Sequence, residues 1–124
     1  MIILAPISVG ELLDKLTILT IKMNKISDPD KRKNVLTEHK ELKSIADKIN
    51  PPIGLDVLYN QLLEVNSELW DIEDAKRKHE KNQQFDTEFI SLARKVYIKN
   101  DLRAKIKKEI NLLVGSTIIE EKSY

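Results

Sequence analysis

Two pairs of acidic residues are the first candidates for chemistry in this sequence. Glu38 and Glu41 lie three residues apart, as do Glu68 and Asp71. Residues three apart share one face of a helix, so two such pairs on facing helices can hold Mg²⁺, which prefers oxygen ligands. About three acidic pairs of this spacing are expected by chance in such a composition, and the chain has four. The alternative interpretation is therefore a solvated helix flank with local ion pairs to lysine.

The spacing of these four carboxylates is similar to that of the all-α nucleoside-triphosphate pyrophosphohydrolases. In those helical bundles, acidic pairs from two helices hold magnesium, and the metal activates water against a phosphoanhydride. The resemblance implies Mg²⁺ bound by the same four residues here. A second segment, residues 28–32, looks like the corresponding region of the helical chorismate mutases, which grip a dicarboxylate with cationic side chains. The preceding predicted helix supplies only lysines for that role: Lys15, Lys22 and Lys25.

A cationic and polar set in the last predicted helix is the candidate site for a small anionic ligand. It consists of Arg94, Tyr97, Asn100, Arg103 and Lys107. A binding module needs a concave or apolar surface, and Trp70 is a further residue that we expect to line one. Aromatic side chains are enriched at interfaces.

The two apolar stripes of this last helix are out of register when it is wound at about 100° per residue. One interpretation is a kink or break near Asn100–Asp101, with the charges on the surface. The other is a straight helix that carries Asn100, Arg103, Lys107 and Asn111 toward the core. Buried cations are costly unless paired, and the third helix offers carboxylates for them at Glu64, Glu68 and Asp71.

Four helices are predicted to position these residues, over 9–26, 29–49, 55–81 and 87–114. Ser8 with Glu11 forms a capping box, Asp28 and Asp86 are N-cap candidates, and Gly115 is a natural C-terminal stop. The first helix is apolar nearly all round, which is typical of a central helix or an oligomer interface. We expect an all-α, antiparallel four-helix bundle in a single domain, 1–124. The β-favouring segments at the two termini can also pair as a short two-stranded ribbon.

Composition excludes several function classes. The net charge of +1 gives no overall attraction to nucleic acid, and the lack of cysteine removes disulfide and cysteine–zinc sites. We expect no membrane span, no leader peptide and a cytoplasmic location, which is the host cytoplasm if the chain is phage-encoded. His39 and His79 lie far apart in sequence without metal-ligand spacing, so both are predicted to be surface residues.

Several stretches together resemble a small uncharacterised protein family of bacteria and their phages, including phages of marine cyanobacteria. They are residues 7–18, 69–74, 85–90, 93–97, 100–104 and 115–124. The resemblance implies a compact standalone protein that sometimes accompanies glycan-modifying genes, and it carries over no catalytic residue. The leading prediction is a non-enzymatic module that binds a small ligand or a protein, without a cofactor, and that dimerises through its first helix. The alternatives are the magnesium-dependent hydrolase and, after it, the chorismate-mutase-like enzyme.

Overall fold

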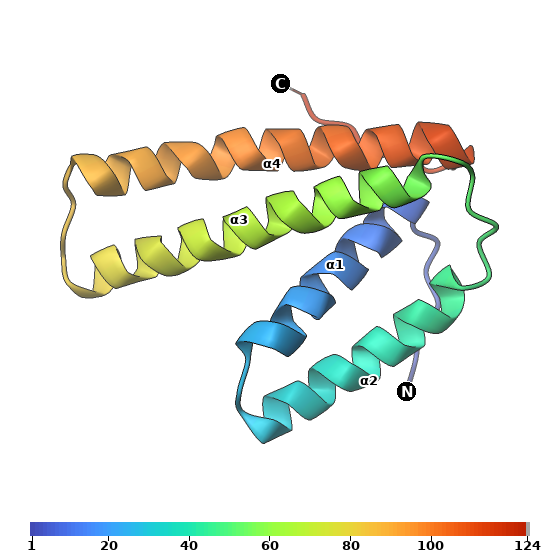
Figure 1. Ribbon diagram of the computed structural model, residues 1–124, viewed down its shortest axis with the longest axis horizontal. Helices are drawn as coiled ribbons and strands as arrows, with labels where there is room; N and C mark the ends of the chain where they lie inside the picture. Colours follow the sequence, from blue (N-terminus) through green and yellow to red (C-terminus); the bar gives the residue numbers. More distant parts are fainter. Residues whose placement is uncertain (124) are drawn as a thin grey trace.

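Four α-helices joined by short connections make up the computed structural model, which describes residues 1–123 (Figure 1). They are α1 (Val9–Lys25), α2 (Pro29–Ala46), α3 (Leu55–Lys81) and α4 (Thr87–Val114). No strand occurs within the described residues. The predicted all-α, four-helix fold is confirmed.

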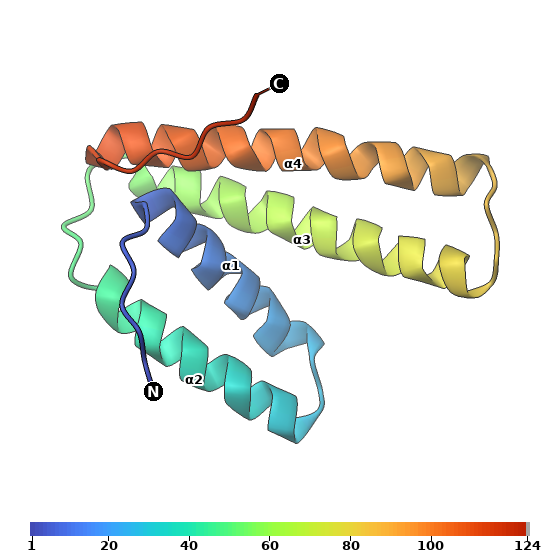
Figure 2. The same cartoon turned by 180° about the vertical axis from the view of Figure 1, so that it is seen from behind.

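The packing of the four helices is centred on α1. The two longest helices, α3 and α4, run antiparallel side by side, and α1 crosses them at one end (Figures 1 and 2). Among the helices, α1 contacts all three others, whereas α2 contacts α1 alone. The chain therefore forms two helical hairpins, α1–α2 and α3–α4, and α1 packs against the second hairpin with α2 on its outer side.

Each helix start that the sequence predicted from a side-chain cap has that cap in the structure. The Ser8 hydroxyl accepts a hydrogen bond from the backbone N–H of Glu11 at 3.1 Å, and the Asp28 carboxylate accepts one from Lys31 at 2.9 Å. Such caps satisfy N–H groups that have no partner within the helix.

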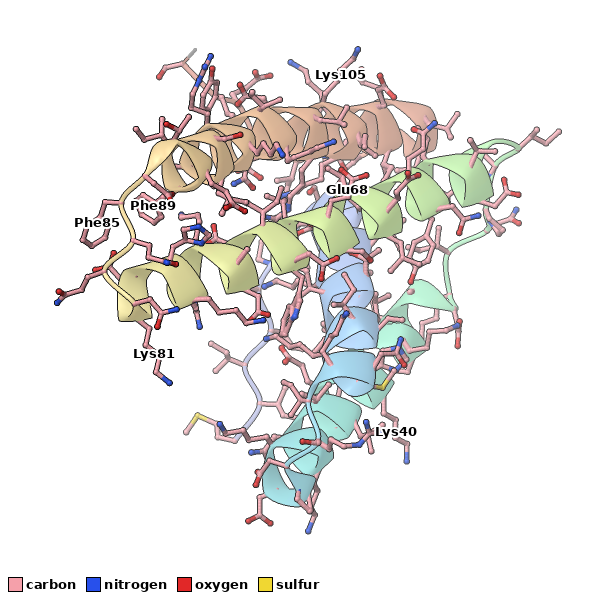
Figure 3. The ribbon with its side chains drawn as sticks, turned by 60° about the vertical axis from the view of Figure 1, so that its left-hand side comes forward. Lys40, Glu68, Lys81, Phe85, Phe89 and Lys105 are labelled. Carbon is pink, nitrogen blue, oxygen red and sulfur yellow. The ribbon has the colours of Figure 1, made fainter. Side chains whose placement is uncertain are left out.

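The connection between α3 and α4 is fixed in the same way. The Asp86 carboxylate accepts a hydrogen bond from the backbone N–H of Phe89 at 3.0 Å. Phe85 lies just before this cap and packs edge-on against the Phe89 ring, with 5.4 Å between the ring centroids (Figure 3). The cap and this aromatic contact together set the direction in which α4 leaves the turn.

The apolar side chains of α1 are mostly buried against the other helices of the same chain. Leu12, Leu13 and Leu16 of α1 are buried in the main core, which α3 and α4 complete with Leu62 and Ile110, both fully buried. None of the large exposed hydrophobic side chains belongs to α1. The first helix is thus the central helix of the chain, and dimerisation through it stays a prediction.

The last helix, α4, is continuous from Thr87 to Val114 with no break near Asn100–Asp101. The straight-helix interpretation therefore holds, and a polar band does enter the core: Lys107 is 8% exposed and Asn111 is 1% exposed. The kink would have kept the polar groups out of the core, whereas in the continuous helix those groups find polar partners on α1.

The two terminal segments do not form the ribbon that their β-favouring composition suggested, as far as residue 123. The segment after Gly115 instead runs back along α4 (Figure 2). Lys107 and Lys108 of α4 bind Glu120 and Glu121 of this segment at 2.9 and 3.0 Å. Ion pairs to α4 thus replace strand pairing.

None of the described helices is long and apolar enough to cross a membrane.

Candidate functional site

A buried carboxylate on α1 is the centre of the polar cluster. Asp14 is 1% exposed and lies where α1 meets α3 and α4. Its Oδ1 accepts hydrogen bonds from Arg103 Nε at 2.8 Å and from Asn66 Nδ2 at 2.9 Å. Its Oδ2 accepts a second bond from the Arg103 guanidinium. This two-point contact fixes both the position and the plane of the guanidinium.

Helical spacing explains why one face of α4 supplies several groups to this cluster. Arg103, Lys107 and Asn111 follow one another at intervals of four residues, so they line a single face. Lys107 Nζ donates to Glu11 Oε2 at 2.7 Å, and Asn111 Oδ1 accepts from the Gly10 N–H at 2.7 Å. Three contacts therefore tie α4 to the N-terminal half of α1.

The electrostatics of the cluster favour its charged forms. Burial raises the pKa of the Asp14 carboxyl, but hydrogen bonds from Arg103 and Asn66 and the positive charges of Arg103 and Lys107 outweigh it, so this pKa is lowered. Burial also lowers the pKa of Lys107, and hydrogen bonds to Glu11 and Glu120 reverse the effect and raise it. The cluster is therefore ionised near neutral pH.

This polar cluster is complete without a ligand among the described residues. Between residues 1 and 123, no buried side-chain nitrogen or oxygen lacks a hydrogen-bond partner. The main effect of the polar cluster is thus to position Arg103, whose side chain remains 28% exposed. The Arg103 face that does not meet Asp14 extends toward Asn100, whose Oδ1 lies 3.3 Å from Nη1.

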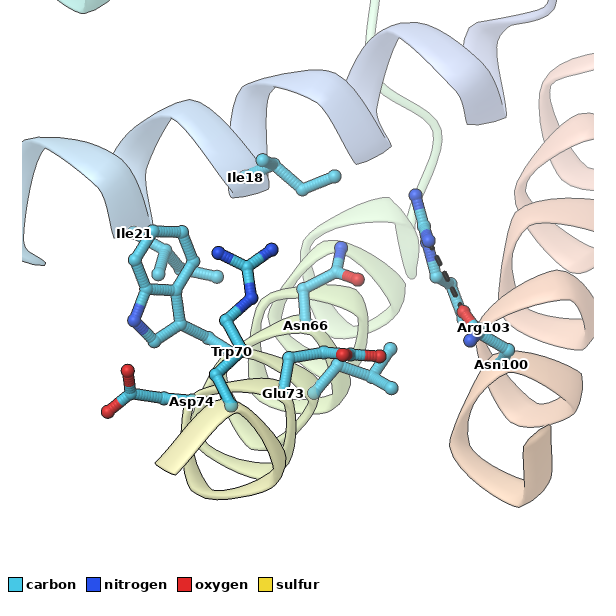
Figure 4. A pocket seen from close by; sticks show the side chains of 10 residues that line it. Ile18, Ile21, Asn66, Trp70, Glu73, Asp74, Asn100 and Arg103 are labelled. Carbon is cyan, nitrogen blue, oxygen red and sulfur yellow. Dashed lines mark hydrogen bonds between the residues drawn. The ribbon is translucent and has the colours of Figure 1, made fainter. Parts of the chain in front are cut away.

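A cleft of about 340 Å³ opens beside Arg103, between α1, α3 and α4 (Figure 4). Its lining combines apolar, aromatic and charged side chains: Ile18, Ile21, Asn66, Leu69, Trp70, Glu73, Asp74, Arg77, Asn100 and Arg103. The size lies at the lower end of the range for small-molecule sites, which are mostly apolar with a few polar groups.

The charges of this cleft are partly neutralised by neighbours outside it. Glu73 lies 3.5 Å from the Lys76 amine, and Asp74 lies 3.5 Å from the Lys78 amine. The Arg77 side chain, in contrast, makes no hydrogen bond or ion pair with any residue from 1 to 123. The cleft therefore offers an indole ring, one fixed guanidinium and one guanidinium without a partner. Such a set fits a flat ligand that carries an anionic group.

The structure divides the predicted ligand site on α4 into two parts. Asn100 and Arg103 line the cleft, and Lys107 belongs to the buried cluster beside it. Arg94 and Tyr97 are exposed outside the cleft. Nine residues at about 100° each place Arg94 on the side of α4 opposite Arg103.

The carboxylates predicted to pair with the polar band of α4 are not the ones that pair with it. Asp14 and Glu11 of α1 take that role, whereas Glu64 is exposed on α3. Two further α3 carboxylates have other partners: Glu68 lies 2.5 Å from the Lys99 amine, and Asp71 lies 3.7 Å from the Lys25 amine. The reason is that α1 lies against the band where the sequence suggested α3.

The four carboxylates of the magnesium hypothesis are not brought together. Glu38 and Glu41 are exposed on α2, which contacts neither α3 nor α4, while Glu68 and Asp71 lie on α3. Because a shared ion requires all ligands within a few ångströms of one point, this geometry does not favour the hydrolase.

The lysines of the chorismate-mutase hypothesis do not line the cleft either. Lys15 lies 3.8 Å from Glu11, and Lys25 is ion-paired with Asp71. Lys22 is half-buried near the end of α1. The three lysines are thus separated along α1, by about 15 Å between Lys15 and Lys25 at 1.5 Å per residue, instead of converging on one dicarboxylate.

Sequence reasoning missed Asp14, Asn66 and Thr17, which form the centre of the cluster. Asn66 Nδ2 also donates to Thr17 Oγ1 at 2.8 Å, and Thr17 is fully buried. The available signal was an aspartate and a threonine within a helix that is otherwise apolar nearly all round. A buried carboxylate of that kind requires a cationic partner.

The lowered pKa of Asp14 predicts a loss of stability in acid. A folded-state pKa below the usual value of 3.8 stabilises the fold above that value, and the contribution disappears as the pH falls toward the folded-state pKa. We expect the free energy of unfolding to drop below about pH 4, and to drop less in Asp14→Asn. Urea titrations between about pH 2 and pH 7 measure this, with Asp30→Asn on exposed α2 surface as the control. An identical acid profile in Asp14→Asn would contradict the prediction.

Comparison with known proteins places the chain in a family. A family of unknown function, DUF6165, matches residues 3–124. No curated protein and no solved structure matches the chain. The matched region contains the whole of the cleft and all four helices.

Proposed function

We propose that this chain, which belongs to the DUF6165 family of unknown function, is a non-enzymatic binding protein. Its cleft between α1, α3 and α4 holds a small molecule that combines a flat ring with one anionic group. The observation that carries the proposal is the pairing of Trp70 with two arginines along one cleft of about 340 Å³.

The two arginines have different roles in this proposal. Arg103 is held in place by the buried Asp14, so it presents a preorganised donor and loses little conformational freedom on binding. Arg77 is exposed and has no ion-pair partner among residues 1–123, so an anion can recruit it. Trp70 and the isoleucines of α1 supply apolar surface for the ring (Figure 4).

Trp70 makes the proposal directly measurable because it is the only tryptophan in the chain. Its fluorescence therefore reports on the cleft alone. We would titrate the protein with probe pairs that share a ring and differ in the anionic group: adenosine 5′-monophosphate with adenosine, and benzoate with benzamide. We expect a saturable fluorescence change with an anionic member and a weaker one with its neutral counterpart. At about 100 times Kd, binding adds about 2.7 kcal/mol to stability, so the melting temperature rises in parallel.

Arg77→Ala is the variant that tests the anion contact. Loss of a charge-assisted hydrogen bond costs about 1.5–3 kcal/mol, so affinity for the anionic probe should fall by roughly tenfold or more. Arg94→Ala is the matched control, since Arg94 is also exposed and without an ion pair among the described residues, but lies outside the cleft. Equal binding of charged and neutral probes, equal losses in both variants, or no fluorescence change with either pair would contradict the proposal.

A further inference from the structure

Three potential metal ligands meet at the connection between α3 and α4, away from the cleft residues. His79 lies in the last turn of α3, Asp86 is the N-cap residue of α4, and Glu88 lies in its first turn. His79 Nε2 is 3.7 Å from Asp86 Oδ1 and 3.6 Å from Glu88 Oε2. Within residues 1–123 no other group of three histidine or acidic side chains places its ligand atoms so close, all within 4.8 Å of one another.

The imidazole of His79 is held in a defined orientation. Its Nδ1 lies 3.0 Å from the backbone oxygen of Ala75, which can only accept, so Nδ1 carries the proton and Nε2 faces the carboxylates. The ring packs against Phe89, with 6.1 Å between the centroids, and the side chain is 13% exposed. A histidine whose second nitrogen donates to a backbone carbonyl is the usual arrangement for a metal ligand.

The separations around Nε2 leave room for an ion. The distances from His79 Nε2 to Glu88 Oε2 (3.6 Å) and to Asp86 Oδ1 (3.7 Å) are too long for hydrogen bonds. Metal bonds of about 2.0–2.2 Å, set at a tetrahedral angle, put two ligand atoms about 3.5 Å apart. Without a cation between them, the lone pair of a neutral Nε2 would face two anionic oxygens. The three groups therefore create a place where a positive charge is strongly favoured.

We propose that His79, Asp86 and Glu88 bind one divalent transition-metal ion, with Zn²⁺ as the best fit. One imidazole nitrogen and two carboxylate oxygens suit zinc, and its affinity exceeds that of manganese or iron(II) at such sites. The remaining coordination positions face solvent and take water. Because the ligands come from the end of α3 and the start of α4, the ion joins the two helices across their turn and stabilises that end of the hairpin.

A proton is the competing occupant of Nε2. The hydrogen bond to Ala75 raises the pKa of His79, burial opposes that change, and the carboxylates of Glu88 and Asp86 add to it. The titration is therefore best done at about pH 8, where the proton competes least.

The experiment is a calorimetric titration of the full chain with ZnCl₂, repeated on three variants. His79→Gln removes the nitrogen ligand. Asp86→Asn removes a charged ligand but keeps the helix cap, because asparagine caps as well as aspartate. His39→Gln is the matched control, since the chain has two histidines and His39 lies on α2 away from the turn.

We expect one zinc ion per chain with a dissociation constant below about 10 μM, and a raised melting temperature. His79→Gln and Asp86→Asn should each weaken binding by roughly tenfold or more, whereas His39→Gln should bind as the parent chain does. Co²⁺ in place of zinc should give visible absorption bands that His79→Gln abolishes. The proposal is overturned if the parent chain binds no zinc at about 100 μM, if His79→Gln binds equally well, or if His39→Gln shows the same loss. Circular dichroism of each variant separates loss of a ligand from loss of the fold.

Discussion

Replacement of Arg103 by alanine is expected to lower the free energy of unfolding by about 3–5 kcal/mol. The substitution leaves the Asp14 carboxylate, 1% exposed, with no guanidinium to balance its charge. The hydrogen bond from Asn66 remains, but a neutral amide cannot replace two charge-assisted bonds from Arg103. Urea denaturation followed by far-ultraviolet circular dichroism measures the loss.

Two comparisons show whether this loss comes from the buried pair. Arg94→Ala removes the same side chain from the opposite, exposed side of α4, and should change stability by less than about 0.5 kcal/mol. Adding Asp14→Asn to Arg103→Ala removes the unpaired charge, so the double variant should recover part of the loss. A strictly additive double-mutant cycle would show that the two residues do not stabilise each other as the structure indicates.

Gly10→Ala is expected to destabilise the protein by about 3 kcal/mol, although helix propensity alone predicts a gain of about 1 kcal/mol. Gly10 lies in the first turn of α1, where the helix backbone approaches α4 closely. A Cβ atom there would lie 2.6 Å from the Lys107 backbone oxygen and 2.9 Å from Asn111 Oδ1. The added methyl group must therefore push the two helices apart and weaken the Gly10 N–H bond to Asn111.

The sign of this effect distinguishes tertiary contact from propensity. Asn24→Ala, at an exposed position of the same helix, should be neutral or slightly stabilising. Combining Gly10→Ala with Asn111→Ala removes the side-chain clash but leaves the Lys107 carbonyl in place, so little stability should return. If thermal denaturation shows that Gly10→Ala is more stable than the parent chain, the close approach of α1 and α4 is refuted.

Local interactions explain why the sequence was sufficient for the helices themselves. Ser8, Asp28 and Asp86 each cap an N–H group three residues ahead, and nothing outside that turn takes part. The same local periodicity showed that a straight α4 would carry Arg103 and Lys107 toward the core. It also identified α1 as apolar nearly all round, which is the property of a central helix. These features depend on neighbours within about one helical turn.

Only the tertiary structure decided which groups on different helices meet. Arg103 binds Asp14, 89 residues earlier, because α1 crosses α4 at Gly10. Of the α3 carboxylates predicted for that role, Glu68 and Asp71 pair with lysines instead. The cleft beside Trp70 and the convergence of His79 with Asp86 and Glu88 depend equally on where the helices lie. The order of residues fixes the face of a helix on which each side chain stands. The distance between two faces follows instead from how the core packs, because burial of apolar surface is non-directional and does not specify individual polar partners.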